Sequence, residues 1–114
     1  MSITIHELDG GVTRVVLAGR IDIKGAQEID TPLSVIGGSR RALVIDLAEV
    51  EFLASIGLRS LVQCAKVVQL KGGKVVLLSP RPVVAEVIQF SGIDELIPIH
   101  DDADEAIAAV SPAR

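Results

Sequence analysis

The stretch LVIDLAEVEFLASIGLRSLV, residues 43–62, contains the pattern that decides the fold. Together with Ala42, its first part is a near-continuous aliphatic run over 42–47, which is typical of a central β-strand covered on both faces. Apolar residues then recur with helical spacing, at Leu58, Leu61, Val62, Ala65 and Val68. A buried strand followed by an amphipathic helix predicts an α/β fold.

The rest of the chain divides into alternating elements on the same grounds. We expect strands over residues 2–7, 12–19, 42–47, 75–79 and 95–100. We expect helices over residues 24–36, about 55–70, 80–92 and 101–110. The DGG turn at 9–11 joins the first two strands into a hairpin. This order predicts a mixed β-sheet opened by a hairpin, with about four α-helices packed on it.

Glycine and proline predict where several elements begin, end or bend. The segment RIDIKG, residues 20–25, is predicted to be a loop, and the glycines of GGSRR, residues 37–41, are expected to end the helix with a positive φ. Pro32 inside the helix should kink or shorten it. Proline at 98 should keep the last strand at an edge of the sheet.

Composition limits the class of protein. A chain of 114 residues fits one domain, and with 49% hydrophobic but only 2% aromatic residues its core must be aliphatic. The net charge of −4 argues against nucleic-acid binding. The lone Cys64, expected to be a core thiol, fits a reducing compartment. Without a signal-peptide pattern or an apolar run near the roughly 20 residues of a spanning helix, we expect a soluble cytoplasmic protein without membrane insertion.

The sequence does not predict an enzyme. Ser55 lacks the G-x-S-x-G elbow of many serine hydrolases, since Leu53 occupies the first glycine's place. Only His6 and His100 could act as bases, and both fall in terminal, strand-like segments. No metal-ligand spacing is present, and KGGK at 71–74 is too short for a phosphate-binding loop. We therefore expect no catalytic residue, no metal and no cofactor.

Two interpretations of Ser55 stay open from its local sequence. A serine at a helix start is usually an N-cap, because its oxygen accepts a hydrogen bond from a free backbone N–H. Alternatively, Ser55 is a phosphorylation site, since a helix N-terminus accommodates an anion. A phosphoserine carries about −1.5 to −2 charges, which would prevent docking of a partner that buries this apolar surface.

The chain as a whole resembles the STAS domain, specifically the anti-sigma factor antagonists of bacteria. The resemblance covers nearly all of the chain and rests on LAGRIDI at 17–23, LVIDLAEVEFLASIGLRSLV at 43–62, KGGKVVLLSP at 71–80 and VAEVIQFSGIDELIPI at 84–99. The central family pattern corresponds to Asp46, Phe52, Ser55, Gly57 and Leu58. The resemblance implies a single STAS domain over residues 1–114.

The resemblance also implies a partner-switching function. In such proteins the serine that matches Ser55 is phosphorylated by an anti-sigma factor that is an ATP-dependent serine kinase. The unphosphorylated form binds this kinase and frees the sigma factor, and a metal-dependent phosphatase of the PP2C type resets the cycle. The resemblance then places partner-binding residues at Arg20, Asp22, Ala54, Ser55, Ile56, Gly57 and Arg59.

This chain departs from the family pattern at two positions. The family often has aspartate before the serine and a second hydroxyl after it, where this chain has Ala54 and Ile56. Ser55 is thus the only acceptor hydroxyl of the motif. The missing acidic neighbour removes a possible kinase contact and also a charge that would repel the phosphate.

Other roles are open for several of these residues. Asp22 would offer a carboxylate to a basic group of the kinase, or it would cap the helix that begins near Lys24. Arg59 would pair with the partner or with the phosphate, or it would be a solvated surface residue. A second hypothesis is a STAS module that is never phosphorylated, such as a regulatory or scaffold subunit of a membrane-associated transport complex. A third is a small enzyme with Ser55 as nucleophile.

Overall fold

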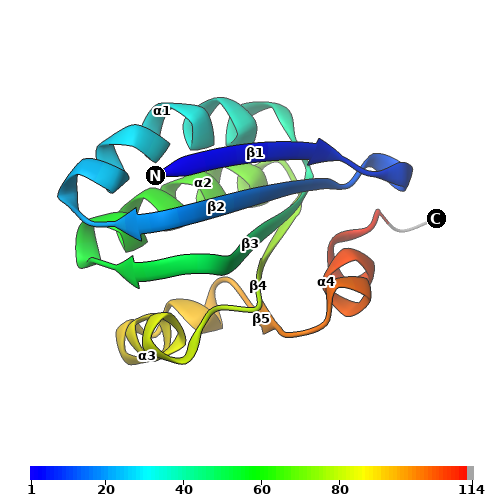
Figure 1. The fold of residues 1–114 in the computed structure, drawn as a ribbon. Coiled ribbons are helices and arrows are strands. Elements are labelled where there is room, and N and C mark those ends of the chain that lie inside the picture. The colour runs from blue at the N-terminus through cyan, green and yellow to red at the C-terminus, as the bar shows by residue number, and fades with distance from the viewer. Residues whose placement is uncertain (113–114) are drawn as a thin grey trace.

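The computed structural model describes residues 1–112, in which one five-stranded sheet is flanked by four α-helices (Figure 1). The strands are β1 (Ser2–Glu7), β2 (Thr13–Ile21), β3 (Ala42–Leu53), β4 (Lys74–Leu78) and β5 (Ile99–His100). The α-helices are α1 (Ile23–Ser39), α2 (Ser55–Leu70), α3 (Pro82–Ser91) and α4 (Ala103–Val110). Short 3-10 turns occupy Asp9–Gly11 and Ile93–Glu95.

The sheet has the order β1-β2-β3-β4-β5 and is mixed. The hairpin strands β1 and β2 are antiparallel, whereas β2–β3, β3–β4 and β4–β5 are parallel pairs. The predicted mixed sheet, with its opening hairpin and about four helices, is therefore confirmed. As expected, β5 lies at an edge.

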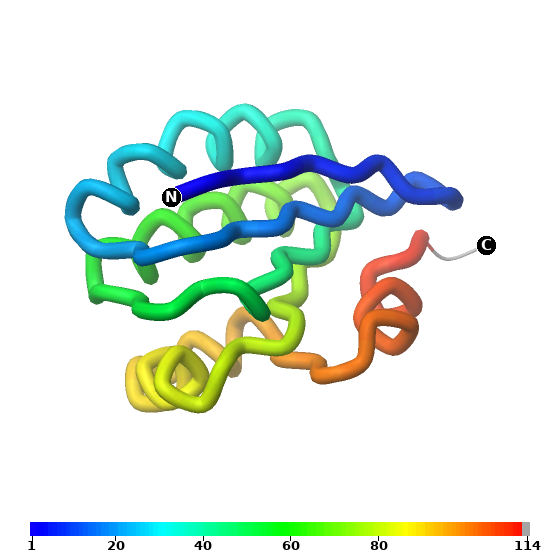
Figure 2. The backbone as a smooth tube through the Cα atoms, viewed as in Figure 1, coloured from blue at the N-terminus to red at the C-terminus, as the bar shows by residue number. Residues whose placement is uncertain are grey.

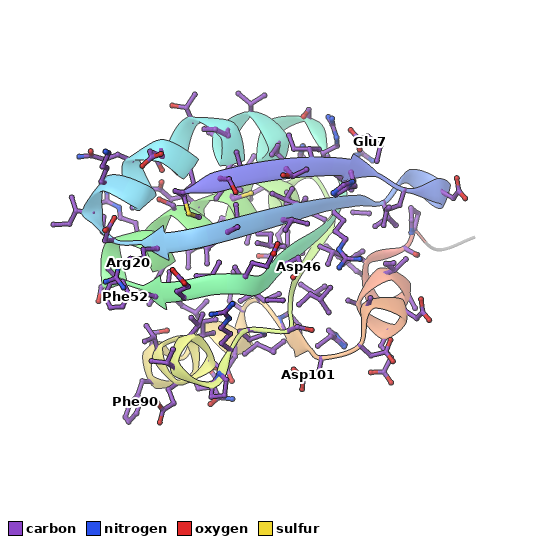
Figure 3. All side chains as sticks on the ribbon, viewed as in Figure 1. Glu7, Arg20, Asp46, Phe52, Phe90 and Asp101 are labelled. Atoms are coloured by element: carbon purple, nitrogen blue, oxygen red, sulfur yellow. The ribbon has the colours of Figure 1, made fainter. Side chains whose placement is uncertain are left out.

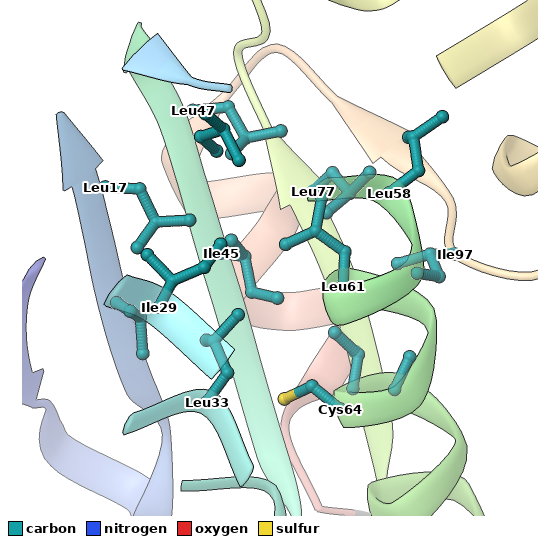
Figure 4. Close-up of a cluster of buried hydrophobic side chains, with 14 of the residues drawn as sticks. Leu17, Ile29, Leu33, Ile45, Leu47, Leu58, Leu61, Cys64, Leu77 and Ile97 are labelled. Atoms are coloured by element: carbon teal, nitrogen blue, oxygen red, sulfur yellow. The ribbon is translucent and has the colours of Figure 1, made fainter. Parts of the chain in front are cut away.

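Alternate residues of β3 face two separate cores. Leu43, Ile45 and Leu47 belong to the main core, which α1 and α2 cover and to which α3 also contributes. Figure 4 shows Ile45 and Leu47 of β3 among side chains from neighbouring strands and the two covering helices. Ala42 and Val44 point the other way, into a smaller core beneath α4. Covering both faces explains the continuous aliphatic run in this strand.

β3 is longer than the sequence predicted, and its second half has a strand on one side only. β4 pairs with residues Ala42–Asp46, whereas β2 pairs with β3 as far as Leu53. Helix α3 lies beside the remaining part of β3 (Figure 2). The guanidinium Nε of Arg81 donates to the Ala48 carbonyl at 2.9 Å, which fastens the start of α3 to this edge. β2 and β3 therefore extend together beyond the end of β4.

The predicted loop over residues 20–25 is wrong. Arg20 and Ile21 continue β2, and α1 begins at Ile23 directly after Asp22. Burial explains the longer strand, since the Ile21 side chain is fully buried. Asp22 has extended backbone angles and its carboxylate caps the helix, so a single residue makes the turn from strand to helix.

The predicted glycine stop of α1 is also wrong. Gly37 and Gly38 are helical, and the C-cap is Arg40 with a φ of −121°. A Cβ atom at residue 37 would lie 3.1 Å from the Cys64 carbonyl oxygen, so glycine here lets α1 and α2 approach closely. Pro32 lies within the helix, which continues past it without interruption.

The C-terminal elements follow the predictions more closely. α3 begins at Pro82 and ends at Ser91, and its C-cap Gly92 has a φ of 77°, the expected left-handed stop. α4 begins after its N-cap, Asp102. The strand expected over 95–100 is reduced to Ile99–His100, because the preceding residues form a 3-10 turn.

Cys64 is a core thiol, as the sequence predicted, with 2% of its surface exposed. Burial raises the pKa of this thiol from 9.0 to about 11, despite the opposing charge of Lys71. Because the thiolate is the reactive form, Cys64 should resist alkylation by iodoacetamide at pH 8 in the native protein and react readily in denaturant. Mass spectrometry of the adduct over time measures both rates, and rapid native alkylation would contradict the burial.

Candidate functional site

The predicted site residues meet where β2 and β3 end and α1 and α2 begin. The Ala54 N–H donates to the Ile21 carbonyl at 2.8 Å, which joins the two strand–helix connections. Arg20, Asp22 and the segment 54–59 therefore lie at one end of the molecule. In Figure 3 this end carries the labels Arg20 and Phe52.

Ser55 is the first residue of α2, and the interpretation of this serine as an N-cap is wrong. The N-cap is Ala54, with extended angles and no side-chain oxygen to offer. The cap position falls there because β3 continues to Leu53. Ser55 is exposed, and within residues 1–112 its hydroxyl makes no capping hydrogen bond. The hydroxyl is therefore available to an approaching molecule.

Asp22 caps α1, which confirms one of its two predicted roles. Its Oδ1 accepts a hydrogen bond from the Gly25 N–H at 2.8 Å. The side chain is half-buried, and an ionised carboxylate has further lone pairs beyond this bond. The capping role therefore fixes the carboxylate beside the Ser55 loop without using all of its acceptors.

Arg20 is held in place by an aromatic ring. Its guanidinium carbon lies 4.6 Å from the centre of the Phe52 ring, and the two residues are partners in the β2–β3 register. Such a cation–π contact contributes about 0.5–1 kcal/mol at an exposed site. Phe52 remains 37% exposed, so the pair presents both a positive charge and an apolar surface.

Two residues of the sequence pattern support the site from within. Gly57 is buried, and a Cβ atom there would lie 2.4 Å from Ile21 Cγ2 and 2.8 Å from Leu53 Cδ1. Only glycine lets the first turn of α2 lie so close to both strand ends. Asp46 lies farther back along β3, where it accepts from Arg14 Nη2 at 2.6 Å and from the Ala48 N–H at 3.0 Å. Neither Gly57 nor Asp46 is part of the exposed surface.

Ser55 lies at the edge of a groove between α2 and α3, which we call the α2–α3 groove. Its lining is mainly apolar, with Glu86 as its one charged side chain, and consists of Ser55, Leu58, Val83, Glu86, Val87, Phe90 and Ser91. The Phe90 side chain is 91% exposed and projects from α3 (Figure 3). α3 was not among the predicted site elements. The available signal was Phe90, one of only two phenylalanines in the sequence.

A second groove, the α1–α2 groove, flanks the other side of the α2 start. It is more polar, and its lining consists of Ala26, Gln27, Asp30, Ile56, Arg59, Ser60 and Gln63. The Ser60 hydroxyl is buried and donates to Asp30 Oδ1 at 3.1 Å, which links the two helices. Arg59 and Ile56 are exposed at its rim. Ser55 thus separates an apolar groove from a polar one.

The fold offers Ser55 no histidine as a base. His6 lies in β1 opposite Arg14, at the start of β2 and far from its end. His100 pairs with Leu78, which in turn pairs with Asp46, well before β3 reaches Ser55. Over the described residues 1–112, no three His, Cys, Asp or Glu side chains gather in a way that could hold a metal ion. No helix in that range has the length and apolar character needed to cross a membrane.

The close packing of Gly57 predicts opposite effects for two glycine substitutions. Gly57→Ala should destabilise the protein by about 1–3 kcal/mol, because the added methyl group forces Ile21 and Leu53 apart. Gly38→Ala should stabilise it by about 0.4–1 kcal/mol, since Gly38 is helical with open space around it. Chemical denaturation of both variants checks this, and an equal effect at the two positions would contradict the packing described.

Comparison with known proteins gives consistent relatives over the whole chain. The family model described as the STAS domain matches residues 4–106. The anti-sigma-F factor antagonist RsfB of Mycobacterium tuberculosis is 29% identical over 115 residues, covering 99% of this chain and 93% of that protein. The putative anti-sigma factor antagonist BtrV of Bordetella bronchiseptica is 28% identical over 114 residues, covering 99% of this chain and 97% of that protein.

The solved structures agree. The crystal structure of an anti-sigma factor antagonist from Mycobacterium paratuberculosis has a TM-score of 0.86 to this chain. It is 30% identical, with 97% of this chain and 94% of that chain covered. An anti-sigma factor antagonist (STAS) domain protein from Planctomyces limnophilus has a TM-score of 0.83 at 26% identity, with 94% of this chain and 95% of that chain covered.

Proposed function

Because the chain belongs to the STAS domain family, we propose that it is an anti-sigma factor antagonist whose partner binding is switched by phosphorylation of Ser55. The observation that carries the switch is the exposed hydroxyl of Ser55, which has no capping role and lies between exposed apolar residues. The names of the relatives RsfB and the Mycobacterium paratuberculosis protein support the coarser assignment.

The unphosphorylated protein docks its partner through the surface around Ser55. Ile56 is 43% exposed, Val83 52% and Phe90 91%, so apolar area is available on both sides of the hydroxyl. Burial of apolar area supplies about 25 cal/mol per Å², and aromatic side chains often dominate such contacts. Arg20, Asp22 and Arg59 add charges around this area, and Ala54 and Gly57 shape the helix start beneath it.

The partner is an anti-sigma factor that is also a serine kinase. It binds ATP and magnesium and transfers the γ-phosphoryl group to Ser55 Oγ, while the hydroxyl proton leaves and ADP is released. A PP2C-type phosphatase reverses the change by adding water to the phosphoserine, which restores the hydroxyl and releases inorganic phosphate. This chain supplies the acceptor and the docking surface and needs no cofactor of its own.

Phosphorylation opposes docking through desolvation. The phosphate brings about −1.5 to −2 charges to a surface that the partner must cover. Burying a charge without a matched partner is costly. Moving the complex from nearly fully bound to nearly fully free requires about 5.5 kcal/mol of differential affinity. A phosphate within the contact that finds no matching cation on the partner is of that order.

Phosphorylation can be tested directly by intact-protein mass spectrometry. After incubation with ATP and a candidate kinase encoded beside this protein, wild type should gain one phosphate and Ser55→Ala none. Ser91→Ala serves as the matched control, since Ser91 lines the same groove but its hydroxyl donates to the Ile88 carbonyl at 2.7 Å. Kinase binding without a mass change would instead indicate a fixed docking module, and a phosphate retained in Ser55→Ala would place the modification elsewhere.

The docking surface can be tested by truncating two side chains that are exposed to a similar extent, Phe90 and Leu70. Phe90→Ala should weaken kinase binding about tenfold or more, because aromatic side chains often supply much of the binding energy of a protein contact and Phe90 is exposed at the groove. Leu70→Ala should leave the affinity unchanged, although Leu70 is 88% exposed, because it lies at the opposite end of α2. Calorimetric titration of both variants with the kinase measures this, and equal losses would contradict the location.

A further inference from the structure

Each of the two grooves beside Ser55 holds one carboxylate, but only the α1–α2 groove also holds a cation. The α2–α3 groove holds one charged side chain, the carboxylate of Glu86. The α1–α2 groove holds Arg59, together with Asp30, whose Oδ1 accepts from Ser60. Within residues 1–112 neither Arg59 nor Glu86 forms an ion pair, and both are exposed. Of the two grooves, a phosphate on Ser55 would therefore meet a cation only on the α1–α2 side, where the Asp30 carboxylate already accepts from Ser60.

Helix geometry brings Arg59 within reach of such a phosphate. Ser55 and Arg59 are four residues apart in α2, so they lie on the same face of the helix. Side chains of a helix lean toward its N-terminus and cover the preceding turn. A long side chain at position 59 can therefore reach over the turn that begins with Ser55. Its guanidinium fork is suited to bidentate contact with phosphate oxygens.

Two other charged groups near this end make contacts of their own. Asp22 uses Oδ1 to cap α1, and the guanidinium of Arg20 lies on the Phe52 ring. Arg59 is the cation of α2 nearest in sequence to Ser55, since the next one, Lys66, lies two turns farther along.

We propose that Arg59 holds the phosphate of phosphorylated Ser55 on the α1–α2 side of the helix, away from Glu86 and the α2–α3 groove. This rests on the proposed function only in taking Ser55 as the modified residue. The phosphate then covers the half of the docking surface that contains Ile56 and Arg59. The apolar groove lined by Phe90 keeps its unmodified shape. A partner specific for the phosphorylated form would meet an arginine-paired dianion on the α1–α2 side.

The proposal can be tested without any kinase. Phosphoserine is incorporated at position 55 during translation, and its second ionisation, ordinarily near pKa 6, is followed by ³¹P NMR titration at low salt. Removing a cation that stabilises the dianion raises this pKa. A unit charge roughly 6 Å away in water-like surroundings corresponds to about 0.5 pH unit, so Arg59→Gln should raise the pKa by about that much. Arg59→Lys should retain most of the wild-type value.

Matched variants separate this role from general charge effects. Lys66→Gln removes a cation from the same helix at a greater distance and should shift the pKa far less than Arg59→Gln. Glu86→Gln should lower the pKa, but by less than Arg59→Gln raises it. The proposal is wrong if Lys66→Gln and Arg59→Gln have equal effects, or if the Glu86→Gln shift is the larger one. Because phosphoserine is installed by translation, these outcomes do not depend on whether the kinase assay succeeds.

Discussion

The rest of the structure depends on the unequal pairing of β3. This strand is bonded to β2 as far as Leu53 but to β4 only as far as Asp46. Two strands thus continue together past the edge that the other strands reach, and the hydrogen bond from Ala54 to Ile21 joins their ends. The start of α2 is carried outward on this extension. A shorter β3 would place the start of α2 closer to the end of β4.

The same extension explains the position of α3, which lies beside the second half of β3, where β4 would continue if it were longer. Beyond Asp46 the backbone of β3 has a free side, and an uncovered strand edge tends to pair with other chains. Arg81 bonds to the Ala48 carbonyl, and the buried Val84 and Ile88 bring α3 against the main core. Protection of the edge and formation of the apolar groove beside Ser55 are therefore one arrangement.

Hydrophobic patterning was sufficient to predict the order and type of nearly all elements. Alternation in residues 2–7 and the aliphatic runs at 42–47 and 75–79 depend on burial, which is a local signal in the sequence. The errors occurred where tertiary contacts override local preference. Gly37 has the chemistry of a helix stop but serves close packing against Cys64. Residues 20–25 have loop-like composition, yet the burial of Ile21 continues the strand.

The site was predictable in part for the same reason. Arg20 near the end of β2, Asp22 after it and the residues around Ser55 all lie where consecutive parallel strands end, and the α/β pattern brings these ends to one edge of the sheet. The contribution of α3 could not be read from sequence, because it depends on how far β3 extends beyond β4. The cap position also depends on that length. Ser55 was predicted to be the N-cap, whereas Ala54 is the N-cap and Ser55 is the first residue of the helix.

The N-cap of α2 is Ala54 and not Ser55, and this bears on the proposed modification. A serine that caps a helix contributes to folding, and modifying its oxygen would then alter stability as well as recognition. Here the cap position belongs to Ala54, and the Ser55 oxygen takes no part in holding α2 in place. If Ser55 is the modified residue, as proposed, its phosphorylation removes no hydrogen bond that caps α2. Recognition can then be changed at an atom that the helix cap does not use.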